Sequence, residues 1–167
     1  EAAYPTFLSG LHFRCEDQDI RQLILDNLWD EEHGADNHVE LWLRFCDALD
    51  LDREAVRTGE PVSATAELVA IYKDLTSNAP LAAGAAALYA YESQVPEVAK
   101  AKIKGLSENY GINDRDSVSF FEVHRTLDLE HSDAERDMLI KLASTDDEAD
   151  AAVKATEEAT GRLWDFL

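Results

Sequence analysis

Two histidines and an aspartate share one face of a segment in the last third of the chain. His124, Asp128 and His131 follow one another at spacings of four and three residues. On a helix that turns ~100° per residue, Asp128 lies about 40° and His131 about 20° from His124 around the axis. Two neutral nitrogen ligands and one carboxylate oxygen suit iron, manganese or zinc. The spacing therefore predicts a metal site, against the alternative of a solvated helix face that carries two histidines.

A second pair of residues, Glu31 and His38, extends this hypothesis. They are seven residues apart, so on a continuous helix they are separated by about 20° around the axis but by ~10 Å along it. Glu31 and His38 can bind the same metal only if the helix bends near Gly34 or if their side chains approach the site from opposite ends. Asp30 and His33 form a competing pair at a spacing of three. That pair is the weaker candidate, because no second histidine shares the face of Asp30.

Glu92 is the third element, a carboxylate near the end of a stretch of small and apolar residues. Buried carboxylates are rare unless they are paired or bound to metal. The alternative is a residue at a helix end that faces water. Together, three carboxylates and three imidazoles suit two divalent irons and leave positions open for dioxygen. These candidate ligands are Glu31, His38, Glu92, His124, Asp128 and His131.

The elements that must position these residues are predicted to be helices. Apolar residues recur at helical spacing, and no stretch shows sustained strand alternation. We expect about seven helical segments in one all-α bundle. The first segment contains residues 23–28, and a second contains 41–49 after a gap at 34–37 that could end or kink the helix. The others cover 63–75, 81–93, 95–110, 114–143 and 148–167, with a polar connector over 50–61. Ser63 and Asp114 or Asp116 are candidate N-caps, Pro96 suits a first turn, and Gly111 a helix end.

Composition restricts the function classes. The chain has 167 residues, with 15 Lys and Arg against 35 Asp and Glu, and its formal net charge is −20. Such a charge argues against nucleic acid or an anionic membrane as the main partner, because phosphate binding needs a basic face. The length predicts one domain over residues 1–167. With neither a secretory pattern at its start nor a membrane-spanning stretch, the chain is expected to be a soluble cytoplasmic protein.

The complete pattern, Glu31-x6-His38, then Glu92, then His124-x3-Asp128-x2-His131, resembles the haem-oxygenase-like dimetal oxidases. Residues 25–32, 37–42, 81–84 and 87–94 resemble one branch, which includes a chlamydial protein that associates with death domains. The resemblance covers nearly the whole chain. It implies a compact haem-oxygenase-like or TenA-like bundle without haem. It also implies that the six residues hold two irons, or an iron–manganese pair, and that O2 is the co-substrate.

This branch supplies para-aminobenzoate for folate synthesis, by oxidative cleavage of one of its own tyrosines with a lysine as nitrogen donor. That lysine matches Lys102, which the local sequence alone makes an ordinary solvated lysine beside two others. The sacrificial tyrosine of the branch precedes the point that matches Glu1, so we expect this chain to lack an N-terminal helix or helices. Tyr91, like Tyr72 and Tyr89, is a candidate radical relay, against the alternative of aromatic packing in the core.

The resemblance also sets expectations for partners and alternatives. We expect a small-molecule substrate or a tyrosine of the protein itself, an external reductant and a homodimer, with a death-domain partner by family analogy alone. A relative could instead use the same centre on an external amino acid or fatty acid, which substrate-dependent O2 uptake would reveal. A metal-independent acidic interaction module would leave six candidate ligands unexplained. A TenA-like thiaminase needs a cysteine nucleophile, and neither Cys15 nor Cys46 has an evident activating partner.

Overall fold

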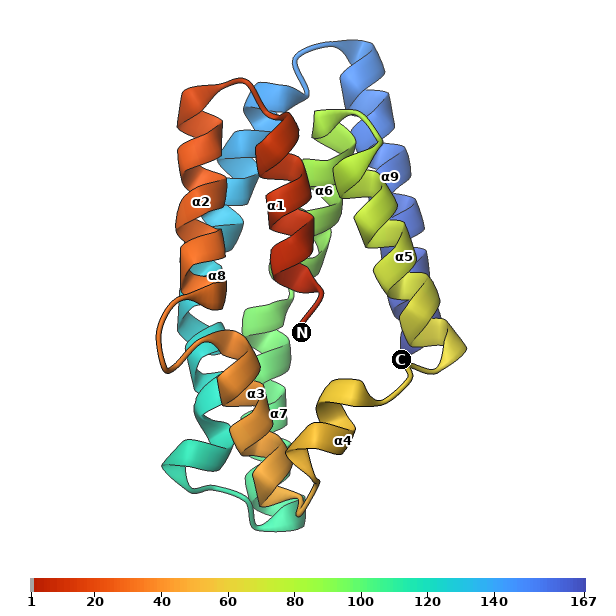
Figure 1. The fold of residues 1–167 in the computed structure, drawn as a ribbon. Coiled ribbons are helices and arrows are strands. Elements are labelled where there is room, and N and C mark those ends of the chain that lie inside the picture. Colours follow the sequence, from red (N-terminus) through yellow and green to blue (C-terminus); the bar gives the residue numbers. More distant parts are fainter. Residues whose placement is uncertain (1) are drawn as a thin grey trace.

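A computed structural model describes residues 2–167, and for residues 128–130 it describes only the backbone. In this part of the chain the secondary structure is entirely helical, which confirms the all-α prediction (Figure 1). The helices are α1 (Tyr4–Arg14), α2 (Gln18–Glu32), α3 (His38–Ala48), α4 (Arg53–Thr58), α5 (Ser63–Ser77), α6 (Leu81–Glu92), α7 (Val95–Tyr110), α8 (Arg115–Leu142) and α9 (Asp146–Phe166). None of the described helices is both long enough and apolar enough to cross a membrane.

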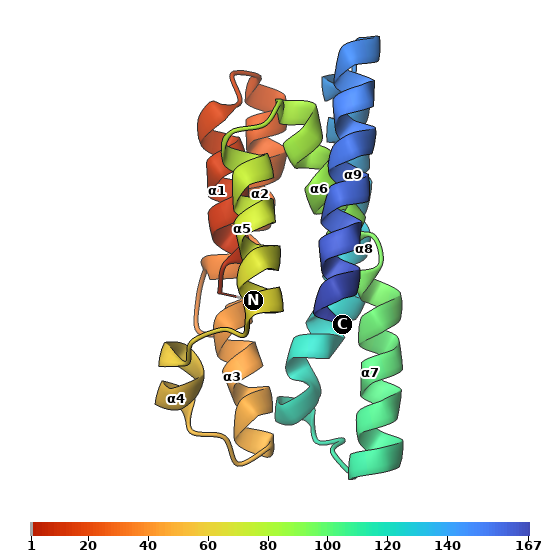
Figure 2. The same cartoon turned by 90° about the vertical axis from the view of Figure 1, so that its right-hand side faces the viewer.

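Helix α6 lies at the centre of the bundle. In Figure 2 it lies between α1, α2 and α5 on one side and α8 and α9 on the other, and it packs against α5, α8 and α9. Helix α8 runs most of the length of the molecule, packing against α6 at one end and against α3 and α7 at the other (Figure 1). Because α2, α3, α6 and α8 all contribute candidate ligands, their packing determines whether a site forms.

Small residues allow the close packing of α6. Its residues from Ala82 to Leu88 are buried, so the helix is apolar around its whole circumference, as expected of a central helix. At Gly84, an added Cβ would lie 3.0 Å from both the Leu11 side chain and the Leu75 carbonyl oxygen. The glycine therefore lets α6 approach the end of α5 more closely than any side chain would allow.

Several helix ends follow local sequence signals. Gly111 has a positive φ of 69° and ends α7, while Pro96 lies in the first turn of that helix. The Asp114 side chain accepts a hydrogen bond from the Ser117 N–H and caps α8. Residues 33–37 end α2 rather than kink it, and Asn37 caps α3 by accepting from the Glu40 N–H.

Other sequence predictions were wrong. The described chain has nine helices rather than about seven, because α1 and α4 were not predicted. Helix α4 lies inside the predicted connector, where the Asp52 side chain accepts from the Ala55 N–H and supplies a cap. Ser63 is the first residue of α5, not its N-cap; that position is Val62, whose side chain makes no capping bond. A six-residue helix such as α4 has too few apolar positions to show a period.

Candidate metal centre

Glu31, His38 and His124 form a buried cluster. One potential ligand atom from each side chain lies within 4.8 Å of those from the other two. The Glu31 Oε1 atom is 2.9 Å from Nδ1 of His38, and the His38 and His124 ring centroids are 4.4 Å apart. All three residues are less than a tenth exposed. A carboxylate oxygen and two imidazoles at these distances can hold one divalent metal.

The break between α2 and α3 resolves the spacing problem of Glu31 and His38. Glu31 lies in the last turn of α2, and His38 is the first residue of α3. The loop between them contains Gly34, whose φ of 86° belongs to the left-handed region that glycine adopts readily. The chain turns there, so two side chains that a straight helix would hold ~10 Å apart come into contact.

His124 is fixed by its own helix. Its Nδ1 lies 2.7 Å from the carbonyl oxygen of Phe120, one turn earlier in α8. A carbonyl only accepts, so Nδ1 carries the proton, and Nε2 keeps the lone pair that a metal needs. Burial, with a smaller contribution from the neighbouring His38, lowers the pKa of His124 to about 4. The imidazole is therefore neutral at physiological pH, the form that can coordinate a metal.

We expect the His124 ring of the metal-free protein to stay neutral down to about pH 4. The unfolded chain would take up this proton near pH 6.5. The contribution of this group to stability is therefore full above pH 6.5 and is lost as the pH falls toward 4. The ¹⁵N chemical shifts of the ring nitrogens, followed from pH 8 to pH 4, measure the transition. A midpoint near 6.5 would contradict the buried position of His124. In the control, zinc-loaded protein, the His124 ring should not titrate over this range.

Glu92 is buried beside this cluster. One of its carboxylate oxygens accepts hydrogen bonds, and the other is uncommitted, meaning that it has no hydrogen-bond partner among the described residues. Its Oε1 accepts hydrogen bonds from the Tyr4 hydroxyl and, at 3.0 Å, from Nδ2 of Asn27. Its Oε2 is buried and has no hydrogen-bond partner among the described residues. Burial raises the pKa of the Glu92 carboxyl, and the nearby Glu31 raises it further. Oε2 is thus the oxygen available to a metal.

The remaining two candidate ligands are on α8. The His131 Nε2 lies 3.1 Å from Oδ2 of Asp30, and His131 is close enough to Glu92 to affect its pKa. The Asp128 side chain lies outside the described residues. The competing pair is not assembled as a site: Asp30 faces His131, while His33 stacks on Trp29 with ring centroids 3.8 Å apart.

The remaining functional candidates are Lys102, Tyr91 and the cysteines. Lys102 is exposed on α7. Tyr91 is half-buried, and its ring centroid lies 5.5 Å from that of Tyr4 and 6.1 Å from that of Tyr72. Burial raises the pKa of the Cys46 thiol, which disfavours the thiolate that a thiaminase would need.

The structure adds three polar residues that the sequence patterns did not single out. Glu135 is 4% exposed and lies 3.5 Å from the Tyr4 hydroxyl, which also reaches Glu92. Asn27, also 4% exposed, donates to Glu92. A spacing signal did exist for two of them, because Asn27 lies one turn before Glu31 and Glu135 one turn after His131. Tyr4 had no such signal, because it comes from a distant helix.

The donor set fits a metal. Glu31 and Glu92 each keep one buried oxygen without a hydrogen-bond partner among the described residues. A buried carboxylate is costly unless it is paired or bound to metal. Two such carboxylates beside imidazoles are the arrangement that divalent cations stabilise. This is also a reason for the chain to bury charge at the junction of four helices.

Comparisons with known proteins agree with this chemistry. Residues 1–163 match the model of a family described as iron-containing redox enzymes. The chain is 43% identical to a 4-aminobenzoate synthase of Nitrosomonas europaea and 40% identical to one of Chlamydia trachomatis, over 99% of this chain and 71% of each relative. A bifunctional coenzyme PQQ synthesis protein C/D of Methylorubrum extorquens is 26% identical over the whole chain and 45% of that protein. The chain therefore belongs to the family of iron-containing redox enzymes and is an oxidoreductase.

Proposed function

We propose that this protein is a 4-aminobenzoate synthase that activates O2 at a centre of two metal ions, two irons or an iron and a manganese. The observation that carries the proposal is the buried cluster of Glu31, His38 and His124 beside the uncommitted Oε2 of Glu92. Relatives at about 40% identity over nearly the whole chain carry the name of this activity. 4-Aminobenzoate is the para-aminobenzoate expected from the sequence.

In this proposal, Glu31, His38 and His124 hold one metal, and Glu92, His131 and Asp128 hold the other. Bound by these residues, two reduced metal ions would supply electrons for the activation of O2, with an external reductant to restore them. The residues of the chain hold the ligands in place: the Phe120 carbonyl fixes the His124 ring, and Asn27 and Tyr4 fix one oxygen of Glu92. Tyr91, packed against Tyr4, is the proposed path for electrons between the centre and an oxidised aromatic side chain.

The product needs an aromatic ring and a nitrogen atom. We propose that the ring comes from a tyrosine of the protein and that Lys102 donates the nitrogen. Lys102 is exposed, so its amine is accessible to a reacting group on another segment. Because both donors belong to the protein, the product would be formed without an added substrate.

The test combines metal analysis with product analysis. The purified protein is loaded with ferrous ion without oxygen, desalted, analysed for metal, and then given O2 and a reductant. We expect about two metals per chain and 4-aminobenzoate detectable by mass spectrometry, with both lost in His124→Ala. Formation of 4-aminobenzoate without bound metal would overturn the proposal, as would bound metal and O2 uptake without this product.

Lys102→Arg tests the nitrogen donor separately. We expect product to fall at least tenfold with metal content unchanged, because Arg retains the charge but not the amine. Lys100→Arg and Lys104→Arg change exposed lysines of the same helix and are the matched controls, which should keep full yield. An equal loss in all three variants would contradict a specific role for Lys102.

A further inference from the structure

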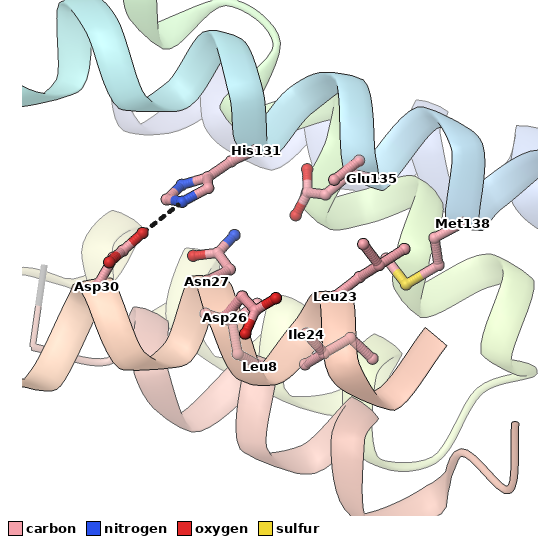
Figure 3. Close-up of a pocket in the computed structure, with 10 residues that line it drawn as sticks. Leu8, Leu23, Ile24, Asp26, Asn27, Asp30, His131, Glu135 and Met138 are labelled. Atoms are coloured by element: carbon pink, nitrogen blue, oxygen red, sulfur yellow. Dashed lines mark hydrogen bonds and ion pairs between the residues drawn. The ribbon is translucent and has the colours of Figure 1, made fainter. Parts of the chain in front are cut away.

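A cavity of about 210 Å³ lies between α2 and α8, next to the metal centre (Figure 3). One part of its wall is apolar and includes Leu8, Ile24 and Met138, each 2% exposed or less. The volume corresponds to roughly seven water molecules. It is large enough for a short alkyl chain with a polar head group.

The polar part of the wall consists almost entirely of hydrogen-bond acceptors. Asn27 uses its Nδ2 to donate to Glu92, and its Oδ1 is buried without a hydrogen-bond partner among the described residues. Glu135 is 4% exposed, and its carboxylate points toward the same space as Asn27 in Figure 3. Asp26 and Asp30, both exposed, lie at the mouth. A ligand that donates hydrogen bonds would give Asn27 Oδ1 a partner and would face carboxylates around it.

Positive charge is scarce around the cavity. Its described lining contains neither lysine nor arginine, and the one basic side chain there, His131, lies 3.1 Å from Asp30. The chain as a whole carries a formal net charge of −20. A carboxylate ligand would therefore be repelled, while a cation would be attracted to the mouth and stabilised inside.

We propose that this cavity binds a free primary alkylammonium ion, with its ammonium group at Asn27 Oδ1 and Glu135 and its alkyl chain along Leu8, Ile24 and Met138. An ammonium has three donors, which matches an unpaired amide oxygen and a buried carboxylate. Lys102 is not among the residues that line the cavity, so the bound amine is a separate molecule. The site adjoins the proposed centre, because Asn27 also donates to Glu92. It goes beyond the proposed function: Lys102 remains the nitrogen donor there, and the alkylammonium ion is a second, exchangeable ligand.

Binding of three probes of equal length tests the proposal: pentylammonium, pentanoate and pentanol. They are titrated calorimetrically into the iron(II)-loaded protein without oxygen, at about 150 mM salt to screen weak surface attraction. We expect pentylammonium to bind at least tenfold more tightly than the other two. Equal binding of pentanol would mean an apolar cavity without ammonium recognition and would overturn the proposal.

Variants locate the site. Glu135→Gln keeps the shape but removes the charge, and it should weaken pentylammonium binding at least tenfold. Asp137→Asn, exposed two residues later on α8, is the matched control and should not change it. Asp26→Asn, an exposed change at the mouth that should not disturb folding, is expected to weaken binding about threefold. Unchanged affinity in both Glu135→Gln and Asp26→Asn would overturn the proposal, since the amine would then bind elsewhere.

Two further outcomes separate this site from the metal centre. Amine binding that requires iron but is insensitive to Glu135→Gln would indicate coordination to the metal, and would overturn the cavity assignment. Amine binding that depends on Glu135, in a protein that makes no 4-aminobenzoate, would support the cavity and overturn the proposed function. Failure of the inference and failure of the proposed function therefore give different results.

Discussion

Replacement of Glu31 with Gln is expected to abolish metal binding while leaving the metal-free protein at least as stable as before. Glu31 is buried, contacts His38 at 2.9 Å and keeps its other oxygen unpaired among the described residues. A neutral amide binds iron far more weakly than a carboxylate, so metal affinity should fall by more than about 100-fold, beyond the loss typical of residues that merely orient a ligand. The amide removes the cost of burying a charge, which favours the metal-free fold.

Thermal unfolding with and without ferrous ion measures both effects. A metal present at 100 times its Kd stabilises the native protein by about 2.7 kcal/mol, and this increment should vanish in Glu31→Gln. Glu32→Gln is the matched control, because Glu32 is the next residue and is exposed. It should retain both the metal content and the increment. Wild-type metal content in Glu31→Gln would show that the cluster is not the binding site.

Gly84→Ala is expected to destabilise the fold, although alanine normally favours a helix over glycine by about 1 kcal/mol. The added Cβ would meet the Leu75 carbonyl oxygen at 3.0 Å and Thr76 Cα at 3.2 Å, both backbone atoms of α5. Backbone atoms in a packed core move only with the whole helix, so overpacking of about 1–3 kcal/mol should outweigh the gain in helix propensity. Gly84→Leu should prevent folding.

Denaturant and thermal unfolding of the metal-free protein measure the Gly84 effect. Overpacking less the gain in helix propensity leaves a net loss of up to about 2 kcal/mol, which for a chain of this size lowers Tm by as much as roughly 8 °C. Gly105→Ala is the control with the opposite sign, because its Cβ would meet only Asn109 Nδ2, at 3.9 Å. That variant should be stabilised by about 0.5–1 kcal/mol. A stabilised Gly84→Ala protein would mean that α5 and α6 are free to separate.

Some features of this structure can be predicted from the sequence, and others cannot. The types and spacing of His124, Asp128 and His131 predict a metal site, because one helix alone sets their relative directions. The ends of α7 and α8 follow from Gly111 and Asp114 for the same reason: the left-handed glycine and the capping aspartate act within a few residues. Interactions of this kind can be predicted from a short stretch of sequence.

Contacts between helices cannot be predicted from a short stretch of sequence. The sequence left open whether Glu31 and His38 could share a metal; the break at residues 33–37 brings their ligand atoms to 2.9 Å. Tyr4 and Glu135, 131 residues apart, meet only because the packing of the bundle brings the Tyr4 hydroxyl of α1 to both Glu92 and Glu135. The cavity between α2 and α8 likewise depends on how two helix faces meet.

The sequence by itself thus determined the helical class, several helix ends and a set of candidate ligands. Tertiary structure decided which carboxylate oxygens are buried and uncommitted, which polar residues support them and where a cavity remains beside them. The physical reason is that helix periodicity and capping act over one or two turns, whereas burial and desolvation depend on packing among helices distant in the chain. Such packing is specified by the whole sequence together and not by any one motif.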